Sequence, residues 1–208
     1  MSLNLVHSYI LSVLGSCGSG KSHIVKYIMA ESKYVFDYVL VFTSTGFTDS
    51  YKYLNKLGIK NKILSSLNID ESIEKIMDKQ KKFYLNKIDS KICLIFDDIM
   101  GTLNSYSKVL KRLLGSFRHY NISIIFVAQY ASVIPTYIRE LSYYNIIFNQ
   151  TTFASLKSIY ESYFGNFNSQ KEFEEWFRNK LIVPYSFFFV DKINKRKFIA
   201  KAPILNNL

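Results

Sequence analysis

A glycine-rich octapeptide near the N-terminus has the residue types and spacing that bind phosphate groups. It fits the pattern G-x-x-x-x-G-K-[ST] and comprises Gly15, Ser16, Cys17, Gly18, Ser19, Gly20, Lys21 and Ser22. Apolar residues 9–14 predict a buried strand before it, and residues 22–30 predict a helix after it. In this context the glycines let backbone N–H groups point toward phosphate oxygens, which the positive end of the helix dipole also attracts. The alternative is a chance glycine turn, but the flanking elements favour a phosphate-binding loop.

Two side chains of this octapeptide have separate expected roles. Lys21 is expected to reach the β- and γ-phosphates of a nucleotide, and the Ser22 hydroxyl is expected to ligate Mg²⁺. The octapeptide therefore predicts ATP and Mg²⁺ as ligands of the chain.

An acidic pair follows a second apolar run. Residues 92–96 predict a buried strand, and Asp97 and Asp98 come directly after it. Two carboxylates at a strand end are costly unless a positive charge lies beside them, which Mg²⁺ would supply. We expect Asp97 to orient Mg²⁺ through its water shell, and Asp98, pointing the other way in a continuing strand, to act as general base. The alternative is a pair of loop aspartates that caps the following helix.

A glutamine ends the next apolar run. Residues 122–128 predict a strand, and Gln129 follows it. If the two strands are neighbours, Gln129 lies beside the acidic pair, where its amide can bond both the attacking water and a γ-phosphate oxygen. The alternative is a glutamine that only satisfies backbone groups at a strand end.

Charge that develops on the leaving phosphate also needs a partner, and an arginine from a neighbouring subunit is a common one. The chain has five arginines. We favour Arg118, which ends an amphipathic helix eleven residues before Gln129, over Arg139, which lies beyond the glutamine strand. Either arginine could instead contact a phosphate backbone or be an ordinary surface charge.

The composition is that of one folded domain. The chain has 208 residues, of which 49% are hydrophobic and 16% aromatic, enough to bury a sizeable core. No run reaches the length of a membrane span, and we expect no secretory signal. We expect no disulfide between Cys17 and Cys93, a reducing compartment, and no zinc site.

Apolar runs alternate with helical patterns, which predicts an α/β fold with a mainly parallel sheet. The expected strands are residues 10–14, 38–43, 92–96, 122–128 and 145–148, and the expected helices are residues 21–31, 70–86, 103–117, 153–164 and 170–181. Residues 185–190 and 197–200 predict a hairpin, so a helical and hairpin portion begins at about residue 153. Residues 46–66 have no clear pattern, although Asp49 is suited to cap a short helix and residues 63–64 to form a short strand.

The net charge of +11 favours a polyanionic partner, either nucleic acid or an anionic membrane. Lysine outnumbers arginine 22 to 5, and AT-rich codons are an alternative source for part of this excess. Solubility alone is the weaker interpretation of the charge. Residues 75–87 are most simply the solvated face of a helix, and the alternative, on grounds of charge, is a DNA contact. Residues 52–62 and 192–201 are candidate pore loops on grounds of charge.

The constellation resembles the viral genome-packaging ATPases of the FtsK–HerA superfamily, in the poxvirus-type branch of large DNA viruses and virophages. The resemblance covers residues 9–190 and rests on four segments: GSCGSGKS at 15–22, ICLIFDDIM at 92–100, FRHYNISIIFVAQ at 117–129 and IPTYIREL at 134–141. It implies a single P-loop ATPase domain over residues 1–208 with a RecA/FtsK-like three-layer sandwich.

By this resemblance Lys21 and Ser22 bind ATP and Mg²⁺, Asp97 is the Walker B acid, Gln129 is the sensor and Arg118 acts in trans. It implies a homo-oligomeric ring, a pentamer or hexamer, that drives double-stranded DNA into a preformed capsid. The ring would bind a capsid vertex protein. It also implies action in the host cytoplasm or virus factory, or at the virion vertex. One departure is Asp98, because many superfamily members have Glu there. The chain has no length for a nuclease domain, so we expect translocation without DNA cutting.

Two other classes of function remain open from the sequence. A P-loop nucleotide kinase, or another small-molecule phosphotransferase, has a similar size, but such enzymes usually bring lid arginines, and this chain has five arginines in all. A structural protein that only binds ATP would not need Asp98 and Gln129.

Overall fold

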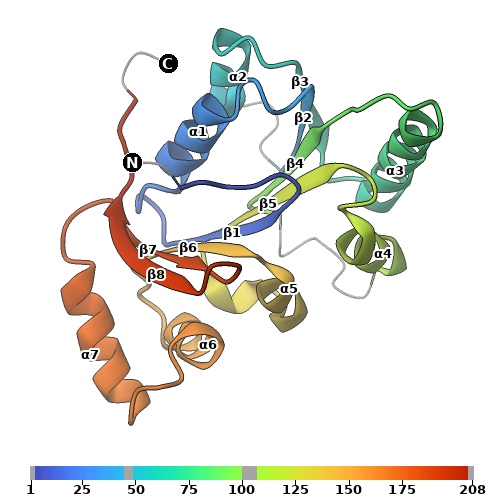
Figure 1. Cartoon of the computed structure of the whole chain (residues 1–208). Coiled ribbons are helices and arrows are strands. Elements are labelled where there is room, and N and C mark those ends of the chain that lie inside the picture. Colours follow the sequence, from blue (N-terminus) through green and yellow to red (C-terminus); the bar gives the residue numbers. More distant parts are fainter. Residues whose placement is uncertain (1–2, 45–48, 100–106, 206–208) are drawn as a thin grey trace.

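The structure is a computed structural model that describes residues 3–44, 49–99 and 107–205. In this part of the chain one eight-stranded sheet has the order β3-β2-β4-β5-β1-β6-β7-β8 (Figure 1). The strands are β1 (Ile10–Leu14), β2 (Tyr38–Thr43), β3 (Asn61–Ser65), β4 (Ile92–Asp97), β5 (Ile122–Ala128), β6 (Tyr144–Phe148), β7 (Ser186–Asp191) and β8 (Arg196–Lys201). Strands β1 to β6 pair in parallel, and β7 and β8 are antiparallel additions.

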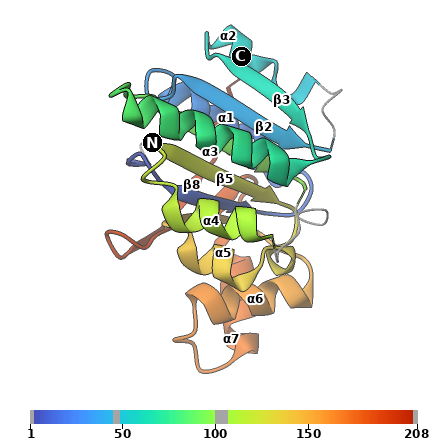
Figure 2. The ribbon, with the colours of Figure 1, turned by 90° about the vertical axis from the view of Figure 1, so that its right-hand side faces the viewer.

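Helices cover both faces of this sheet. They are α1 (Lys21–Glu31), α2 (Tyr53–Lys56), α3 (Ile69–Leu85), α4 (Lys108–Ser116), α5 (Thr136–Leu141), α6 (Phe153–Tyr163) and α7 (Gln170–Lys180), with 3-10 turns η1 (Asp49–Tyr51) and η2 (Ala131–Val133). Helices α1 and α2 lie on one face, and α3 to α7 lie along the other (Figures 1 and 2). The predicted α/β three-layer fold with a mainly parallel sheet is confirmed.

The two hydrophobic cores follow from alternation along the central strands. In β1, Leu11 and Val13 pack in the core under α1, whereas Ile10 and Leu14 pack in the core under α3 to α7. Because both faces are covered, β1, β5 and β6 are buried along their whole length. This is why they appear in the sequence as continuous apolar runs.

The helix bounds mostly agree with the expected ones, to within one or two residues at each end. For the predicted helix 103–117, residues 103–106 lie outside the described part of the chain, and α4 is described from Lys108, with Ser107 as its N-cap. Its predicted apolar face is buried through Leu110, Leu113 and Leu114. The sequence analysis did not predict α5, and it predicted only residues 63–64 of β3.

The C-terminal portion continues the same sheet. Strand β7 pairs with β6, and an aromatic cluster joins it to the last two helices through Phe164, Phe173, Trp176, Phe177 and Phe188. Within the described residues, no helix has the length and apolarity needed to cross a bilayer.

Candidate active site

The glycine octapeptide forms the turn between β1 and α1, and a hydrogen bond ties it to β5. The Gly15 amide donates to the Ala128 carbonyl over 3.1 Å. Because β5 lies directly beside β1, this bond sets the loop next to Gln129, which follows Ala128. The loop and the predicted sensor residue therefore lie at the same edge of the sheet.

Two glycines of the loop are required by its geometry. Gly20 has a φ of 110°, a conformation that side chains disfavour, and it precedes the first residue of α1. A Cβ at Gly15 would lie 2.7 Å from Cβ of Phe148, a distance that forbids any side chain. The loop can therefore approach β6 closely while the first N–H groups of α1 remain directed out of the helix end.

The Lys21 side chain folds back over the loop. Its Nζ donates to the carbonyls of Gly15 at 2.7 Å and Ser16 at 2.9 Å. Burial lowers the pKa of Lys21, while the nearby Cys17, Asp98 and Asp97 raise it. The ammonium group is thus held at the loop with acidic side chains in its surroundings.

The hydroxyl groups of the loop differ in their surroundings. Ser22 is exposed at the start of α1, and Ser16 donates to the Asn149 carbonyl over 3.4 Å. The Ser19 hydroxyl is buried and has no hydrogen-bond partner among the described residues. Cys17 is an exposed free thiol, and Cys93 is a buried one.

Asp98 and Gln129 are in direct contact. Gln129 donates from Nε2 to Oδ2 of Asp98 over 2.7 Å, and the Asp98 amide donates to the Val127 carbonyl over 3.1 Å. The expectation that Asp98 continues a strand is wrong, because β4 ends at Asp97 and Asp98 has a φ of 53°. This left-handed turn, rather than strand alternation, directs the Asp98 side chain to Gln129.

Asp97 has a partner that the sequence did not reveal. The Tyr51 hydroxyl, from η1, donates to Oδ2 of Asp97 over 2.9 Å, and Tyr51 is buried. Burial raises the pKa of Asp97; the Tyr51 hydrogen bond lowers it, Asp98 raises it and Lys21 lowers it. A carboxylate whose charge is disfavoured in this way is suited to a cation. No periodic pattern marks Tyr51, because η1 (Asp49–Tyr51) is a three-residue turn, too short to have one.

Arg118 lies at the other end of β5 from Gln129. It is exposed between α4 and β5, with its guanidinium 4.9 Å from the ring centre of Tyr143 and 5.7 Å from that of Phe117. The seven residues of β5 separate it from the phosphate loop of its own chain by about 23 Å. Arg118 therefore cannot complete the site of its own subunit.

Arg139 is buried and hydrogen-bonded within the fold. Its guanidinium donates to the carbonyls of Ala131 and Ile134 and to the hydroxyls of Thr136 and Ser162. These bonds fasten η2 and α5 to α6. Of the two arginines considered for a role in trans, only Arg118 is available at the surface.

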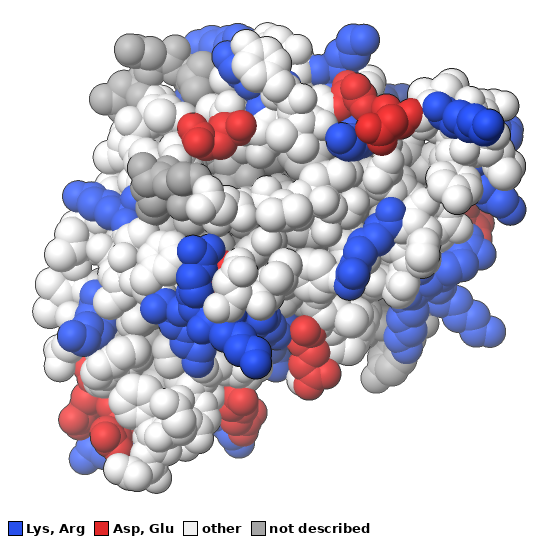
Figure 3. All heavy atoms as spheres, viewed as in Figure 1, with Lys and Arg blue, Asp and Glu red and all other residues white. Residues whose placement is uncertain are grey.

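Lysines line a groove beside the edge strand β3. Lys60, Lys62, Lys75 and Lys79 surround a cavity of about 710 Å³ between β3 and α3. Other basic side chains are spread over the face shown in Figure 3, where acidic ones are fewer.

The two segments proposed as pore loops, 52–62 and 192–201, lie at opposite ends of the sheet, near β3 and β8. Among the described residues no group of three or more His, Cys, Asp or Glu side chains forms a metal cluster.

The fold is shared with several nucleotide-dependent proteins of known structure. The B204 protein of Sulfolobus turreted icosahedral virus, described as a DNA-packaging ATPase, matches with a TM-score of 0.72 and 16% identity, over 96% of this chain and all of that one. The EssC protein of Geobacillus thermodenitrificans, over its ATPases 2 and 3, matches with a TM-score of 0.64 and 11% identity, covering 96% of this chain and 41% of that one. At these identities the likeness shows the fold.

Sequence comparison gives the family. The uncharacterized protein L437 of Acanthamoeba polyphaga mimivirus is 27% identical over 165 residues, which is 76% of this chain; the chain spans 58% of the length of that relative. The family model of the poxvirus A32 protein matches residues 2–161, well over half of the sequence. The resemblance to the poxvirus-type branch is thereby confirmed, and the chain belongs to the poxvirus A32 protein family.

Proposed function

We propose that this chain binds ATP and Mg²⁺ and hydrolyses ATP to drive double-stranded viral DNA into a preformed capsid. The observation that carries the proposal is the contact between Asp98 and Gln129 beside the phosphate loop. A pure nucleotide binder has no use for a carboxylate and an amide joined at this point. The family membership and the packaging function named for the B204 proteins support the same reading.

The residues present fit the two ligands. The Gly15–Ala128 hydrogen bond, the left-handed Gly20 and the unpartnered Ser19 hydroxyl together form a loop suited to phosphate oxygens. Asp97 and the Ser22 hydroxyl are the oxygen donors that Mg²⁺ prefers. When bound, Mg²⁺ would neutralise part of the phosphate charge.

The chain's own residues would then divide the work of hydrolysis. Lys21 would exchange its two loop carbonyls for phosphate oxygens, since an ammonium group gains more from charged acceptors. Asp98 would accept a proton from the attacking water, and Gln129 would orient that water. A hydrogen bond already joins the two side chains, so little rearrangement is needed before water binds.

Assembly and location follow from the same proposal. The chain would act as a ring of five or six copies, in which Arg118 of one subunit reaches the nucleotide of its neighbour. The net charge of +11 is suited to a DNA partner. A capsid vertex protein would recruit the ring in the host cytoplasm, in the virus factory or at the virion.

The test is phosphate release from ATP with and without double-stranded DNA at moderate salt, with Lys21→Ala as the inactive variant. Lys33→Ala is the matched control, because Lys33 lies beside the exposed ring of Tyr34, outside the loop. We expect DNA to stimulate release, and the stimulation to weaken steeply as salt rises. Phosphate appearing on an added nucleoside monophosphate would support a nucleotide kinase instead. No turnover would support a structural role.

A further inference from the structure

The strand order gives a bound nucleotide a direction. On one side of β1 lie β5, which Gln129 follows, and β4, which Asp98 follows; on the other side lie β6 and β7. If the γ-phosphate points toward Asp98 and Gln129, as the proposed function requires, the nucleoside leaves the loop toward β6 and β7. This inference rests on the proposed function and concerns the side chains on that second side.

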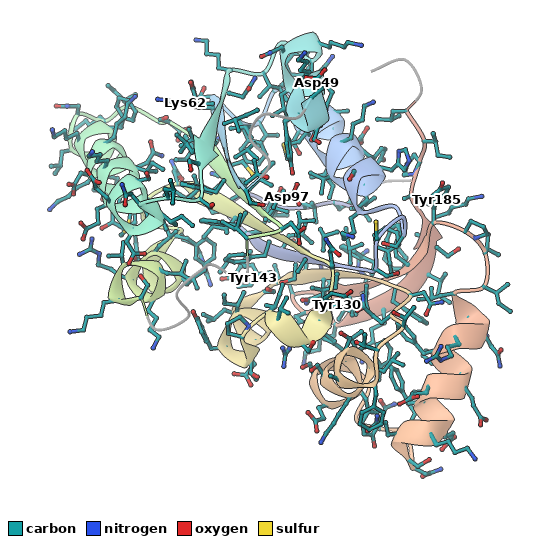
Figure 4. All side chains as sticks on the ribbon, turned by 180° about the vertical axis from the view of Figure 1, so that it is seen from behind. Asp49, Lys62, Asp97, Tyr130, Tyr143 and Tyr185 are labelled. Atoms are coloured by element: carbon teal, nitrogen blue, oxygen red, sulfur yellow. The ribbon has the colours of Figure 1, made fainter. Side chains whose placement is uncertain are left out.

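Tyr185 lies against the phosphate loop on that side. It directly precedes β7, whose residue Phe187 pairs with Phe148 at the end of β6. A Cβ built on Gly20 would lie 3.0 Å from Cδ1 of Tyr185, and the Tyr185 ring centre is 5.5 Å from that of His23 in an edge-to-face arrangement. Figure 4 shows Tyr185 beside α1, away from Asp97 at the end of β4.

The backbone holds this tyrosine in an unfavourable conformation. Tyr185 has a φ of 65°, which a bulky residue rarely adopts, and such conformations persist where the surroundings enforce them. The Ser186 amide donates to the Val183 carbonyl over 3.1 Å, and the Ala202 amide donates to the Tyr185 carbonyl over 2.9 Å. These two bonds hold the backbone on both sides of Tyr185, and the ring packs against Gly20 and His23.

The neighbouring surface is apolar. Ile182 and Val183 are 74% and 51% exposed, and they come just before Tyr185. Tyr185 itself is half-buried, so part of the residue faces solvent. A flat, partly apolar ligand could cover these groups, and a nucleobase has this shape.

We propose that Tyr185 is the platform on which the base of the nucleoside triphosphate stacks, with Ile182 and Val183 flanking it. Every nucleobase has a π-face, so this contact adds affinity for nucleosides and discriminates little between adenine and guanine. The phosphate loop and the tyrosine touch through Gly20, so the base and the phosphates are bound by one connected surface.

The experiment compares two ligands by calorimetry in the presence of Mg²⁺: AMPPCP, which carries a base, and inorganic tripolyphosphate, which does not. We expect Tyr185→Ala to weaken AMPPCP binding by about tenfold and to leave tripolyphosphate binding unchanged. Tyr185→Phe, which keeps the ring, should bind both ligands like the unaltered protein. Tyr34→Ala is the matched control, since Tyr34 is 89% exposed and lies beyond the far end of α1.

A second variant with a fluorescence readout guards against misfolding of Tyr185→Ala. In Tyr185→Trp, AMPPCP should quench tryptophan fluorescence and tripolyphosphate should not, against a background from Trp176, the single natural tryptophan. Equal weakening of both ligands in Tyr185→Ala, or no weakening of either, would overturn the base platform while leaving ATP binding intact. Failure of the unaltered protein to bind either ligand would instead overturn the proposed function, and the platform with it.

Discussion

The phenolic hydroxyl of Tyr51 donates a hydrogen bond to Oδ2 of Asp97 over 2.9 Å. This bond occupies one oxygen of the Asp97 carboxylate. It joins a residue from the turn η1 to the strand that carries the acidic pair. The position of Asp97 therefore depends on a segment that no motif marks.

Tyr51→Phe removes this hydrogen bond and keeps the ring. We expect the Mg²⁺ concentration that gives half-maximal ATP hydrolysis to rise about tenfold, in line with the loss of about 1.5 kcal/mol for one hydrogen bond to a charged group. Metal titrations of phosphate release measure it. Tyr53→Phe is a close control, because Tyr53 is also buried, lies 5.8 Å from Tyr51 between ring centres, and has a hydroxyl without a partner among the described residues. An equal shift in both variants would contradict the role of Tyr51.

Asp98→Asn separates binding from turnover. The asparagine can still accept the hydrogen bond from Gln129, so the loop should keep its shape, but it cannot take a proton from water. We expect the rate of hydrolysis to fall by about 10² to 10⁴, with AMPPCP affinity unchanged. Asp89→Asn is the control, since Asp89 is an exposed carboxylate near Lys91. Retained turnover in Asp98→Asn would remove Asp98 from the catalytic residues.

Arg118→Ala tests whether the ring shares its active sites. We expect the variant alone to be at least 10³-fold less active, and mixing it with Lys21→Ala to restore part of the activity, because some interfaces then combine an intact Lys21 with an intact Arg118. Phosphate release from mixtures at several ratios measures this. Arg112→Ala should remain active, since Arg112 is an exposed partner of Glu74 at 3.3 Å. Absence of any rescue at every ratio would argue against action in trans.

Asp191→Asn tests the turn between β7 and β8. The Asp191 carboxylate is buried and accepts hydrogen bonds from the Ile193 amide, from Asn194 and from Arg196. Burial alone would raise the pKa of Asp191, but the bonds from Asn194 and Arg196 outweigh it and lower that pKa. We expect the substitution to lower the free energy of unfolding at pH 7 by about 2 kcal/mol.

The pH dependence of this difference has a definite sign. Because the folded pKa of Asp191 is lowered, its stabilisation is present above the unfolded pKa of about 3.9 and is lost as pH falls through the folded pKa. The difference between the unaltered protein and Asp191→Asn should therefore shrink below about pH 4. Denaturant unfolding at pH 7 and pH 3 measures it, and a difference that stays constant would contradict this account.

The strands and long helices could be predicted because burial on both faces leaves continuous apolar runs and amphipathic helices leave a spacing of three and four. The sequence predicts that Gln129 lies near Asp98 but not that the two side chains form a hydrogen bond. That bond depends on a turn in which Asp98 has a left-handed conformation. The burial of Arg139 and the presence of α5 were harder to predict from the sequence. The arginine's four acceptors come from η2, the residue after it, the start of α5 and α6, and no local pattern reveals that a charged residue is buried among them.

Strand β5 has the predicted sensor, Gln129, just beyond one end and Arg118 shortly before the other. Strand β5 is paired along its length with β1 and β4, so the sheet holds its two ends in a fixed relation. If Arg118 contacts the nucleotide of the next subunit, the loss of a phosphate at Gln129 in one copy would shift Arg118 through the single strand β5. The neighbour's nucleotide would then respond to hydrolysis in the first copy. The order in which the subunits of the ring hydrolyse ATP would then depend on the length of one β-strand.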